Sequence, residues 1–254
     1  TIKQLAMGSM HTCAVGSNHQ AYCWGHNQYG QLGNNLTVHM NVPTAVHQGE
    51  IPTNVYITQL VAGDAHTCAV GSNYKAYCWG HNYHGQLGNA VSGSPSAGSV
   101  PTAVHQGEIP TNVYITQLAV GGSHTCAVGS NHQAYCWGYN YRGQLGNSSY
   151  TDRSVPTGVS QGNMSTLEWN EIAHITANSQ YTCALSFSRR EYCWGDNSDG
   201  QLGDGSTSNS VYPIAVHRGE IPYDKMISQI DAGYYHNCVI TDDGKVYCWG
   251  SGGG

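Results

Sequence analysis

The alternation of apolar and polar positions predicts a β-hairpin as the first element of the chain. With its turn at Ser17-Asn18-His19, Cys13 lies directly opposite Cys23. One face then carries Cys13, Val15, Ala21 and Cys23, and the other carries Thr12, Ala14, Tyr22 and Trp24. Both faces are largely apolar, so we expect the hairpin to be covered on both sides.

This hairpin occurs five times. The copies begin at His11, His66, His124, Tyr181 and His236, about 55 residues apart. The connecting segment 42–60 also returns unchanged as 100–118. We therefore expect one domain, residues 1–254, built from repeats at approximately 1–50, 51–108, 109–166, 167–221 and 222–254, the last of them incomplete.

Every cysteine belongs to this repeat, two per copy. Directly opposed strand residues have Cβ atoms about 4.5–5.5 Å apart, close to the distance that a disulfide spans. Zinc sites favour clustered ligands, so a metal site fits the spacing poorly, and free thiols are the other alternative. We predict five disulfides: Cys13–Cys23, Cys68–Cys78, Cys126–Cys136, Cys183–Cys193 and Cys238–Cys248. Such bridges indicate an oxidising compartment, so we expect a secreted or cell-surface protein.

Hairpins that are apolar on both faces fit a closed ring of packed sheets, a β-propeller. The tryptophan at the end of each hairpin is expected to pack between neighbouring blades. The segments Ile57–Leu60 and Ile115–Leu118 alternate like further strands, and Gly30-Gln31-Leu32-Gly33 is expected to form a turn anchored by its leucine. The predicted class is all-β, with scarcely any helix.

The repeat resembles that of the regulator of chromosome condensation family. The resemblance is carried by Gly8, His11, Tyr22, Trp24-Gly25 and Gly30–Gly33, with their later copies. It implies blades of about 50 residues, typically seven to a ring. The founding members are intracellular and bind a small GTPase and chromatin, whereas the cysteine pairs resemble repeats of secreted or surface proteins of microbes. The fold is therefore expected to be shared, and nucleotide exchange is not.

The fifth copy stops at Trp249-Gly250, before the Gly-Gln-Leu-Gly turn that the other four contain. Three arrangements stay open: a five-bladed ring, part of a larger ring, or a unit completed by another copy. The first residue is Thr1, so we expect either that processing removed the start or that the chain is part of a longer one.

Composition and the absence of certain motifs limit the functions that this chain can have. Charged residues make up 9% of the chain, the formal net charge is −6, and no cluster of lysine or arginine occurs, which argues against nucleic-acid binding. No apolar run approaches the roughly 20 residues of a membrane span. Neither a Gly-x-Ser-x-Gly elbow nor a phosphate loop is present, so we expect a non-enzymatic protein without a cofactor.

Two side-chain sets have mainly structural interpretations. His11, His66, His124 and His236, with Tyr181 in the fourth copy, are expected to bond backbone groups near their own turns; a metal-binding ring is the alternative. Asp196, Asp199 and Asp204 suggest calcium, but their spacing does not match an EF-hand loop. No metal site is predicted.

The best candidate for a binding surface follows the tryptophan strand. Its members lie in turns and are expected on one rim of the propeller: His26, Tyr29, His81, Tyr83, His84, Tyr139, Tyr141 and Arg142. Tyrosine combines a flat apolar ring with a hydroxyl, which suits recognition; local packing of loop aromatics is the alternative. Asn35, Asn147 and Asn163 begin N-glycosylation sequons, usable in a eukaryotic secretory host.

These observations favour an extracellular module whose rim binds a protein or glycan, with several repeats adding avidity. A second hypothesis is a subunit of an extracellular fibre or matrix, in which the open edge of the fifth unit accepts a strand from another copy. A third, resting on fold analogy alone, is inhibition of a secreted enzyme, since some propellers resembling this family inhibit β-lactamases.

Overall fold

The computed structural model describes residues 1–162, 164 and 171–252, and only the backbone of residues 94–97. This part of the chain contains nineteen β-strands and no helix, which confirms the predicted all-β class. Within the same residues, no helical segment has the length and apolar character that a membrane crossing requires.

The strands form five antiparallel sheets, one per repeat, which we call blades 1 to 5. The bounds are β1 (Ile2–Met7), β2 (His11–Gly16), β3 (Ala21–Gly25) and β4 (Met40–Ala45) in blade 1; β5 (Ile57–Ala62), β6 (His66–Gly71), β7 (Ala76–Asn82) and β8 (Ser94–Ala103) in blade 2; β9 (Ile115–Val120), β10 (His124–Gly129), β11 (Ala134–Gly138) and β12 (Arg153–Gly158) in blade 3; β13 (Ile172–Asn178), β14 (Tyr181–Ser186), β15 (Glu191–Gly195) and β16 (Ser210–Ala215) in blade 4; and β17 (Ile227–Ala232), β18 (His236–Thr241) and β19 (Val246–Gly250) in blade 5.

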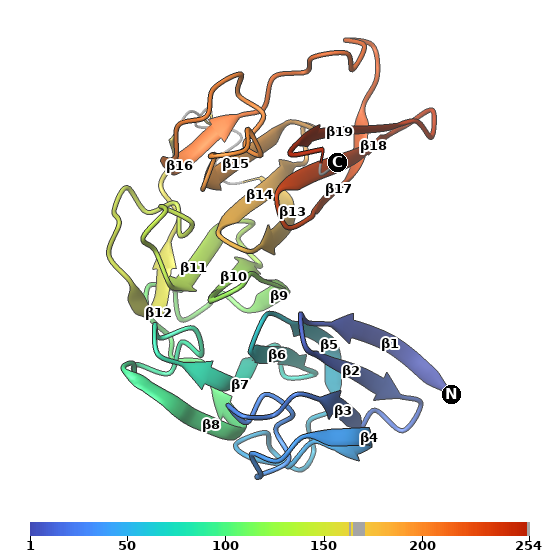
Figure 1. The fold of residues 1–254 in the computed structure, drawn as a ribbon, viewed down its shortest axis with the longest axis vertical. Coiled ribbons are helices and arrows are strands. Elements are labelled where there is room, and N and C mark those ends of the chain that lie inside the picture. Colours follow the sequence, from blue (N-terminus) through green and yellow to red (C-terminus); the bar gives the residue numbers. More distant parts are fainter. Residues whose placement is uncertain (163, 165–170, 253–254) are drawn as a thin grey trace.

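The blades follow one another around an open arc (Figure 1), with the first strand of each blade on the inner side and the fourth on the outer side. Blades 1 and 5 lie at the two ends of the arc. The ends are uncovered: Leu5 of blade 1 is 56% exposed, whereas Leu60 and Leu118, at the same position in blades 2 and 3, are 1% and 2% exposed. In this structure the five blades therefore form a partial propeller.

The predicted hairpin register is confirmed in every blade. Cys13 pairs with Cys23 and Thr12 with Trp24, and the same pairing recurs in the other four. All five predicted disulfides are present. The turn needs one left-handed residue, which is His19 at φ 60° in blade 1 and Gly244 at φ 79° in blade 5.

A recurring polar network joins consecutive blades. The carbonyl oxygen of Gln31 in blade 1 accepts hydrogen bonds from Thr67 Oγ1 (2.8 Å) and Trp79 Nε1 (3.0 Å) of blade 2. The Trp137, Trp194 and Trp249 indoles donate in the same way to the preceding blade. The prediction that tryptophans pack between blades is thus confirmed for four of them; Trp24 lies in blade 1, the first of the described blades.

For His11, His66 and His124, the predicted hydrogen-bond partner is wrong. His11 Nε2 lies 2.8 Å from Thr67 Oγ1 of the next blade, and His66 and His124 make the same contact with Thr125 and Thr182. Because the threonine hydroxyl donates to the glutamine carbonyl, it accepts from the histidine, which therefore carries its proton on Nε2. The imidazoles of these three histidines therefore link blades, and their Nδ1 atoms have no hydrogen-bond partner in their own turns.

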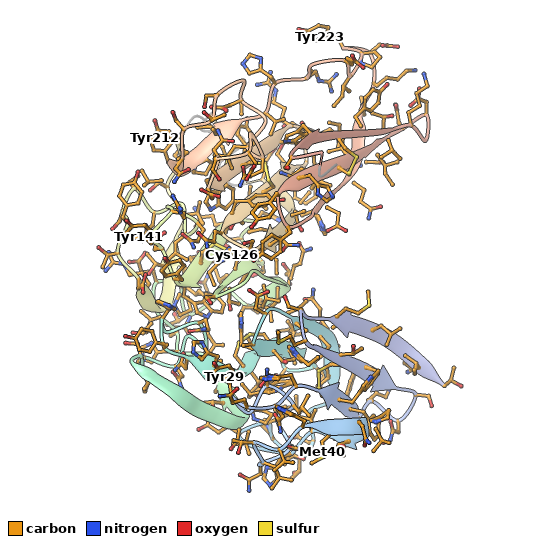
Figure 2. The ribbon with its side chains drawn as sticks, in the orientation of Figure 1. Tyr29, Met40, Cys126, Tyr141, Tyr212 and Tyr223 are labelled. Atoms are coloured by element: carbon orange, nitrogen blue, oxygen red, sulfur yellow. A yellow bond between two sulfur atoms is a disulfide. The ribbon has the colours of Figure 1, made fainter. Side chains whose placement is uncertain are left out.

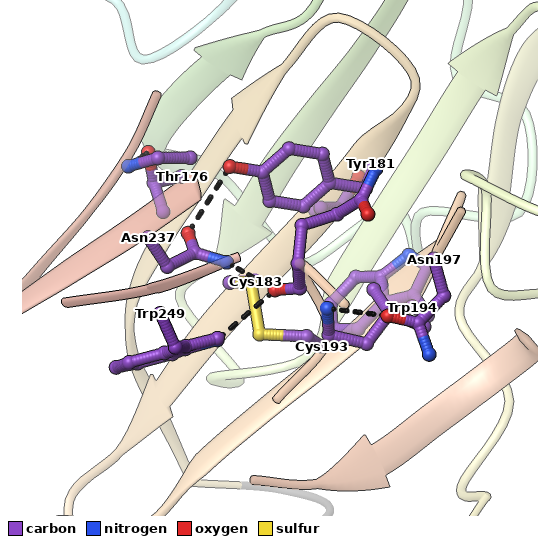
Figure 3. Close-up of a disulfide and its surroundings, with 12 residues drawn as sticks. Thr176, Tyr181, Cys183, Cys193, Trp194, Asn197, Asn237 and Trp249 are labelled. Carbon is purple, nitrogen blue, oxygen red and sulfur yellow. Dashed lines mark hydrogen bonds between the residues drawn. A yellow bond between two sulfur atoms is a disulfide. The ribbon is translucent and has the colours of Figure 1, made fainter. Parts of the chain in front are cut away.

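The seam between blades 4 and 5 replaces histidine by tyrosine and threonine by asparagine (Figure 3). The Tyr181 hydroxyl lies 2.6 Å from the carbonyl oxygen of His236 and 3.3 Å from Asn237 Oδ1. Asn237 and Trp249 both donate to the carbonyl oxygen of Gln201. The diverged fourth copy therefore keeps the blade-to-blade connection with different side chains.

Disulfide accessibility differs between blades. The cysteines of blades 1 to 4 are fully buried, because the half-cystine face of each blade packs on the next blade, whereas Cys238 is half-buried and Cys248 is exposed. Mild phosphine reduction without denaturant, followed by alkylation and peptide mapping, should label Cys238 and Cys248 first. Equal labelling of Cys126 and Cys136 under these conditions would contradict the packing described here.

Candidate functional site

The loop that follows the third strand of each blade is held by a buried asparagine. Asn27 is fully buried; its side-chain oxygen accepts from the Leu32 amide (2.9 Å), and its side-chain nitrogen donates to the carbonyl oxygens of Leu36 and Val38 (both 3.0 Å). Asn82, Asn140 and Asn197 occupy the same position and make the same bond to their leucines. One amide side chain thus fixes the loop conformation in four blades.

A buried glutamine in the same loop orients the rim side chains. Gln31 Nε2 donates to His26 Nδ1 (3.0 Å), and Gln86 Nε2 donates to His81 Nδ1 (2.8 Å). Since Nδ1 accepts, each neutral imidazole carries its proton on Nε2 and presents a donor. Burial, with a smaller contribution from a neighbouring histidine, lowers the pKa of both rings, so they are neutral at pH 7.

All eight residues predicted for the rim lie on one continuous band across blades 1 to 3, which we call the aromatic rim. Neighbouring ring centroids are 6.3 Å apart for His26–Tyr29, 4.6 Å for Tyr29–His81, 6.5 Å for His81–Tyr83, 5.1 Å for Tyr83–His84, 4.4 Å for His84–Tyr139 and 6.4 Å for Tyr139–Tyr141. The Arg142 guanidinium ends the band, 5.8 Å from the Tyr141 ring centroid. In Figure 2, Tyr29 and Tyr141 mark its position on blades 1 and 3.

The aromatic rim faces solvent and carries charge at one end. Tyr83 is 55% and Tyr141 67% exposed, so more than half of the surface of each residue is accessible to solvent. Asp152 accepts a 2.8 Å hydrogen bond from His84 Nδ1, and Arg142 Nε lies 3.7 Å from a carboxylate oxygen of Asp196. The surface therefore offers flat apolar rings, imidazole and hydroxyl groups, and a guanidinium beside carboxylates.

Sequence reasoning missed two members of this surface. His39 stacks on His26, with ring centroids 4.4 Å apart, and Asp152 contacts His84. Both occupy the position twelve residues after the buried asparagine, where they accept a hydrogen bond from its backbone amide. Alignment of the loops on that asparagine would have identified them.

The acidic candidates have structural partners. Asp196 accepts from Gln201 Nε2 (3.0 Å), and Asp204 accepts from Asn197 Nδ2 (3.1 Å). Within the described residues, no three histidine, cysteine or acidic side chains are grouped closely enough to hold a metal ion. Asp196 instead borders the aromatic rim through Arg142.

The three sequons differ in their surroundings. Asn35 is exposed at φ 62°, so its side chain is open to modification. The side-chain nitrogen of Asn147, to which a glycan would be attached, is buried, so the structure argues against this site. Asn163 lies outside the described residues.

The opposite rim carries aromatic pairs that the sequence did not single out. Their ring centroids are about 5 Å apart in His19–Tyr56, Tyr74–Tyr114 and His132–Phe187. Tyr74 and Tyr114 are 56% and 51% exposed. These are separate pairs between neighbouring blades, so this surface lacks the continuity of the aromatic rim.

Antiparallel blades repeated around an arc, with tryptophan–glutamine seams between them, define a β-propeller of tandem repeats. The model of the RCC1-like domain matches residues 1–254, and the chain belongs to this family. This confirms the resemblance seen in the sequence.

Several known proteins are similar to this chain in sequence or in fold. The ultraviolet-B receptor UVR8 of Arabidopsis thaliana is 30% identical over 98% of this chain and 53% of its own length. Prp20p of Saccharomyces cerevisiae has a similar structure, with a TM-score of 0.78 and 23% identity over 98% of this chain and 57% of that one. The ectodomain of the Arabidopsis thaliana receptor kinase ACR4 gives a TM-score of 0.59 and 20% identity over 100% and 69%. The chain thus spans about half the length of UVR8 and of Prp20p.

Proposed function

We propose that this chain is an extracellular, non-enzymatic recognition module that binds a protein or glycan through the aromatic rim. The observation that carries the proposal is the continuity of the rim: side chains from three blades form one exposed band of rings, and buried amides fix the loops that present them. Fixed aromatic side chains lose little conformational entropy on binding, which favours recognition.

The chemistry of the rim suits both ligand classes. Tyrosine rings stack on sugar rings or apolar side chains, and the Nε2–H groups of His26 and His81 can donate to hydroxyl or carbonyl oxygens. Among the relatives, Prp20p is described by its binding to Gsp1p and histones, so a propeller of this shape supports protein binding. A basic patch of the kind that nucleic acid requires is missing from the sequence.

Two observations support the extracellular part of the proposal. Five disulfides, four of them fully buried, fit an oxidising compartment. The ACR4 structure similar to this one is an ectodomain. Native material with ten free thiols would contradict this part of the proposal.

The test replaces Tyr83 and Tyr141 by alanine in one variant. Both side chains are mostly exposed, so the fold should be retained, while binding to a ligand found by glycan array or by pull-down from surface extracts should weaken at least about tenfold, as for aromatic residues at the centre of an interface. The matched control replaces Tyr74 and Tyr114, equally exposed on the opposite rim, and should bind like the parent. The proposal fails if neither screen yields a ligand for the folded chain, or if both variants lose binding equally.

A further inference from the structure

The rim opposite to the aromatic rim carries a pocket at the seam between blades 2 and 3. It has a volume of about 260 Å³ and lies between the β6–β7 turn and the connection from β8 to β9. Both flanking blades are complete four-stranded sheets, so this pocket does not arise from an end of the chain. We call it the blade 2 pocket. Its lining includes Tyr74, Lys75, Val104, His105, Ile109 and Ile115.

Blade 1 has the same elements at the equivalent place but almost no pocket. The space there, at the seam between blades 1 and 2, has a volume of about 40 Å³. Most of its lining comes from the segment 42–60, which recurs unchanged as 100–118. The lining residues of the two sites differ only where His19-Gln20 is replaced by Tyr74-Lys75. The difference in volume therefore follows from the exchange of two side chains.

Gln20 closes the space in blade 1. Its side-chain nitrogen donates to the Val46 carbonyl oxygen (3.0 Å), so the amide lies across the site. At the same position of blade 2, Lys75 is exposed, and no carboxylate in the described part of the chain lies within 4 Å of its ammonium group. Blade 2 thus has an open space and an unpaired cation where blade 1 has an amide that bridges the site.

Aromatic and aliphatic side chains form the apolar walls of the blade 2 pocket. The Tyr74 ring, on a residue that is 56% exposed, packs against Tyr114, with ring centroids 4.9 Å apart. Ile109 and Ile115 are buried and contribute aliphatic surface. Surfaces of this kind favour a ligand with a flat apolar ring.

The polar groups of the pocket favour an anionic ligand. Lys75 provides an ammonium group, and His105 provides a second donor. The His105 Nδ1 accepts from the Gly107 amide (3.0 Å), which leaves the proton on Nε2. None of the lining residues, all of which belong to the described part of the chain, is acidic, so the ammonium charge is available to a ligand. A carboxylate accepts hydrogen bonds from both kinds of donor.

We propose that the blade 2 pocket binds a small organic anion, namely a flat apolar ring that carries a carboxylate. The ring packs between Tyr74 and the aliphatic wall. The carboxylate accepts from the Lys75 ammonium and from His105 Nε2. This site lies on the rim opposite to the aromatic rim and does not depend on the proposed function.

The probe for this site is naphthalene-2-acetate, an aromatic ring system with one carboxylate. Its NMR resonances, followed as the intact, oxidised chain is added, should show saturable binding. Naphthalene-2-acetamide keeps the ring and the shape but lacks the charge, and it should bind about tenfold more weakly. Lys75→Gln should weaken binding of the acid by a similar factor, because it removes the charge and introduces the amide that closes the site in blade 1.

Lys245→Gln is the matched control, since Lys245 is the exposed lysine at the equivalent position of blade 5, and this variant should bind the acid like the parent. The variant lacking Tyr83 and Tyr141 should also bind it normally, whereas the variant lacking Tyr74 and Tyr114 should lose it. This contrast separates the blade 2 pocket from the aromatic rim. All of these side chains are exposed, so the variants should fold, which circular dichroism verifies.

The site should also be transferable to blade 1. His19→Tyr and Gln20→Lys, introduced together into the Lys75→Gln chain, recreate the tyrosine–lysine pair beside an identical connecting segment and should restore binding of the acid. The proposal is overturned if the folded chain shows no saturable binding, or if the acid and the amide bind equally. It is also overturned if Lys75→Gln leaves the affinity unchanged, or if the transfer restores nothing.

Discussion

Replacement of Trp137 by alanine is expected to lower the free energy of unfolding by about 4 kcal/mol, as for other fully buried aromatic side chains. Trp137 is 0% exposed and lies between blades 2 and 3. Its indole Nε1 donates to the Gln86 carbonyl oxygen (3.0 Å), and its ring packs so closely on Gly88 that a Cβ there would lie 2.6 Å from Nε1. Alanine would leave a cavity in this seam and remove a donor from a buried carbonyl.

Trp24→Ala is the matched control because Trp24 occupies the same position of the repeat in blade 1. Among the described residues no blade packs against its indole from the preceding side, and the side chain is half-buried. We expect its loss to cost about 1–2 kcal/mol, since less apolar area is removed from water. Urea unfolding of the oxidised proteins, followed by circular dichroism, measures both changes. Equal destabilisation by the two substitutions would show that the tryptophans do not act through the blade seam.

The hairpins were predictable because their information is local. A two-residue period and cysteines at fixed spacing determine which residues face each other, and the structure has the register inferred for residues 11–25. The seam was only partly predictable. Tryptophan could be assigned to it from its size and recurrence, but the Gln31 carbonyl and the Thr67 hydroxyl that complete it lie in different blades.

The fourth strands were not predictable from their own residues. Met40–Ala45 contains a proline and shows no clear alternation, so it does not have the pattern of a strand. Its counterparts β8 and β12 are fixed on one side by main-chain pairing and on the other by the glutamate of the preceding blade. Such a strand depends on bonds to residues about 50 positions away, which no local pattern contains.

The aromatic rim was more predictable from sequence than the fourth strands and less predictable than the hairpins. The repeat placed all eight candidate side chains in equivalent turns, yet contacts such as His84–Tyr139 depend on how neighbouring blades stack. Gln31 and Asn27, which hold the loops, are polar residues that composition alone would assign to the surface. They are fully buried because loop backbone groups satisfy their amides.

Acidification from pH 7 to pH 5 is expected to destabilise the fold by about 4 kcal/mol, mainly through three seam histidines. Burial lowers the pKa of His66 and His124 to about 3 and that of His11 to about 4. Between the ordinary histidine pKa of 6.5 and these values, the unfolded chain binds protons that the folded chain does not. The free energy of unfolding therefore falls as the pH falls through this window, by about 2 kcal/mol per histidine at pH 5.

One carboxyl group opposes this trend. Burial raises the pKa of Glu191 to about 7, so its ionisation destabilises the fold at neutral pH. Its protonation between pH 7 and pH 5 therefore increases the free energy of unfolding by about 2 kcal/mol. Three histidines outweigh one glutamate, so the net change is a loss of stability. Removal of a single histidine should reduce the loss by about 2 kcal/mol, because the other seam histidines stay neutral in the folded chain down to pH 5 and each keeps its own contribution.

The variant that isolates this effect is His66→Gln. Glutamine keeps an N–H that can donate to Thr125 Oγ1, the partner of His66 Nε2 at 3.0 Å, but it does not titrate. Urea unfolding at pH 7, 6 and 5 should show a shallower pH dependence for this variant than for the parent. Parallel pH profiles would mean that His66 is already protonated in the folded chain or unaffected by unfolding, and either result contradicts a neutral imidazole enclosed between blades 2 and 3.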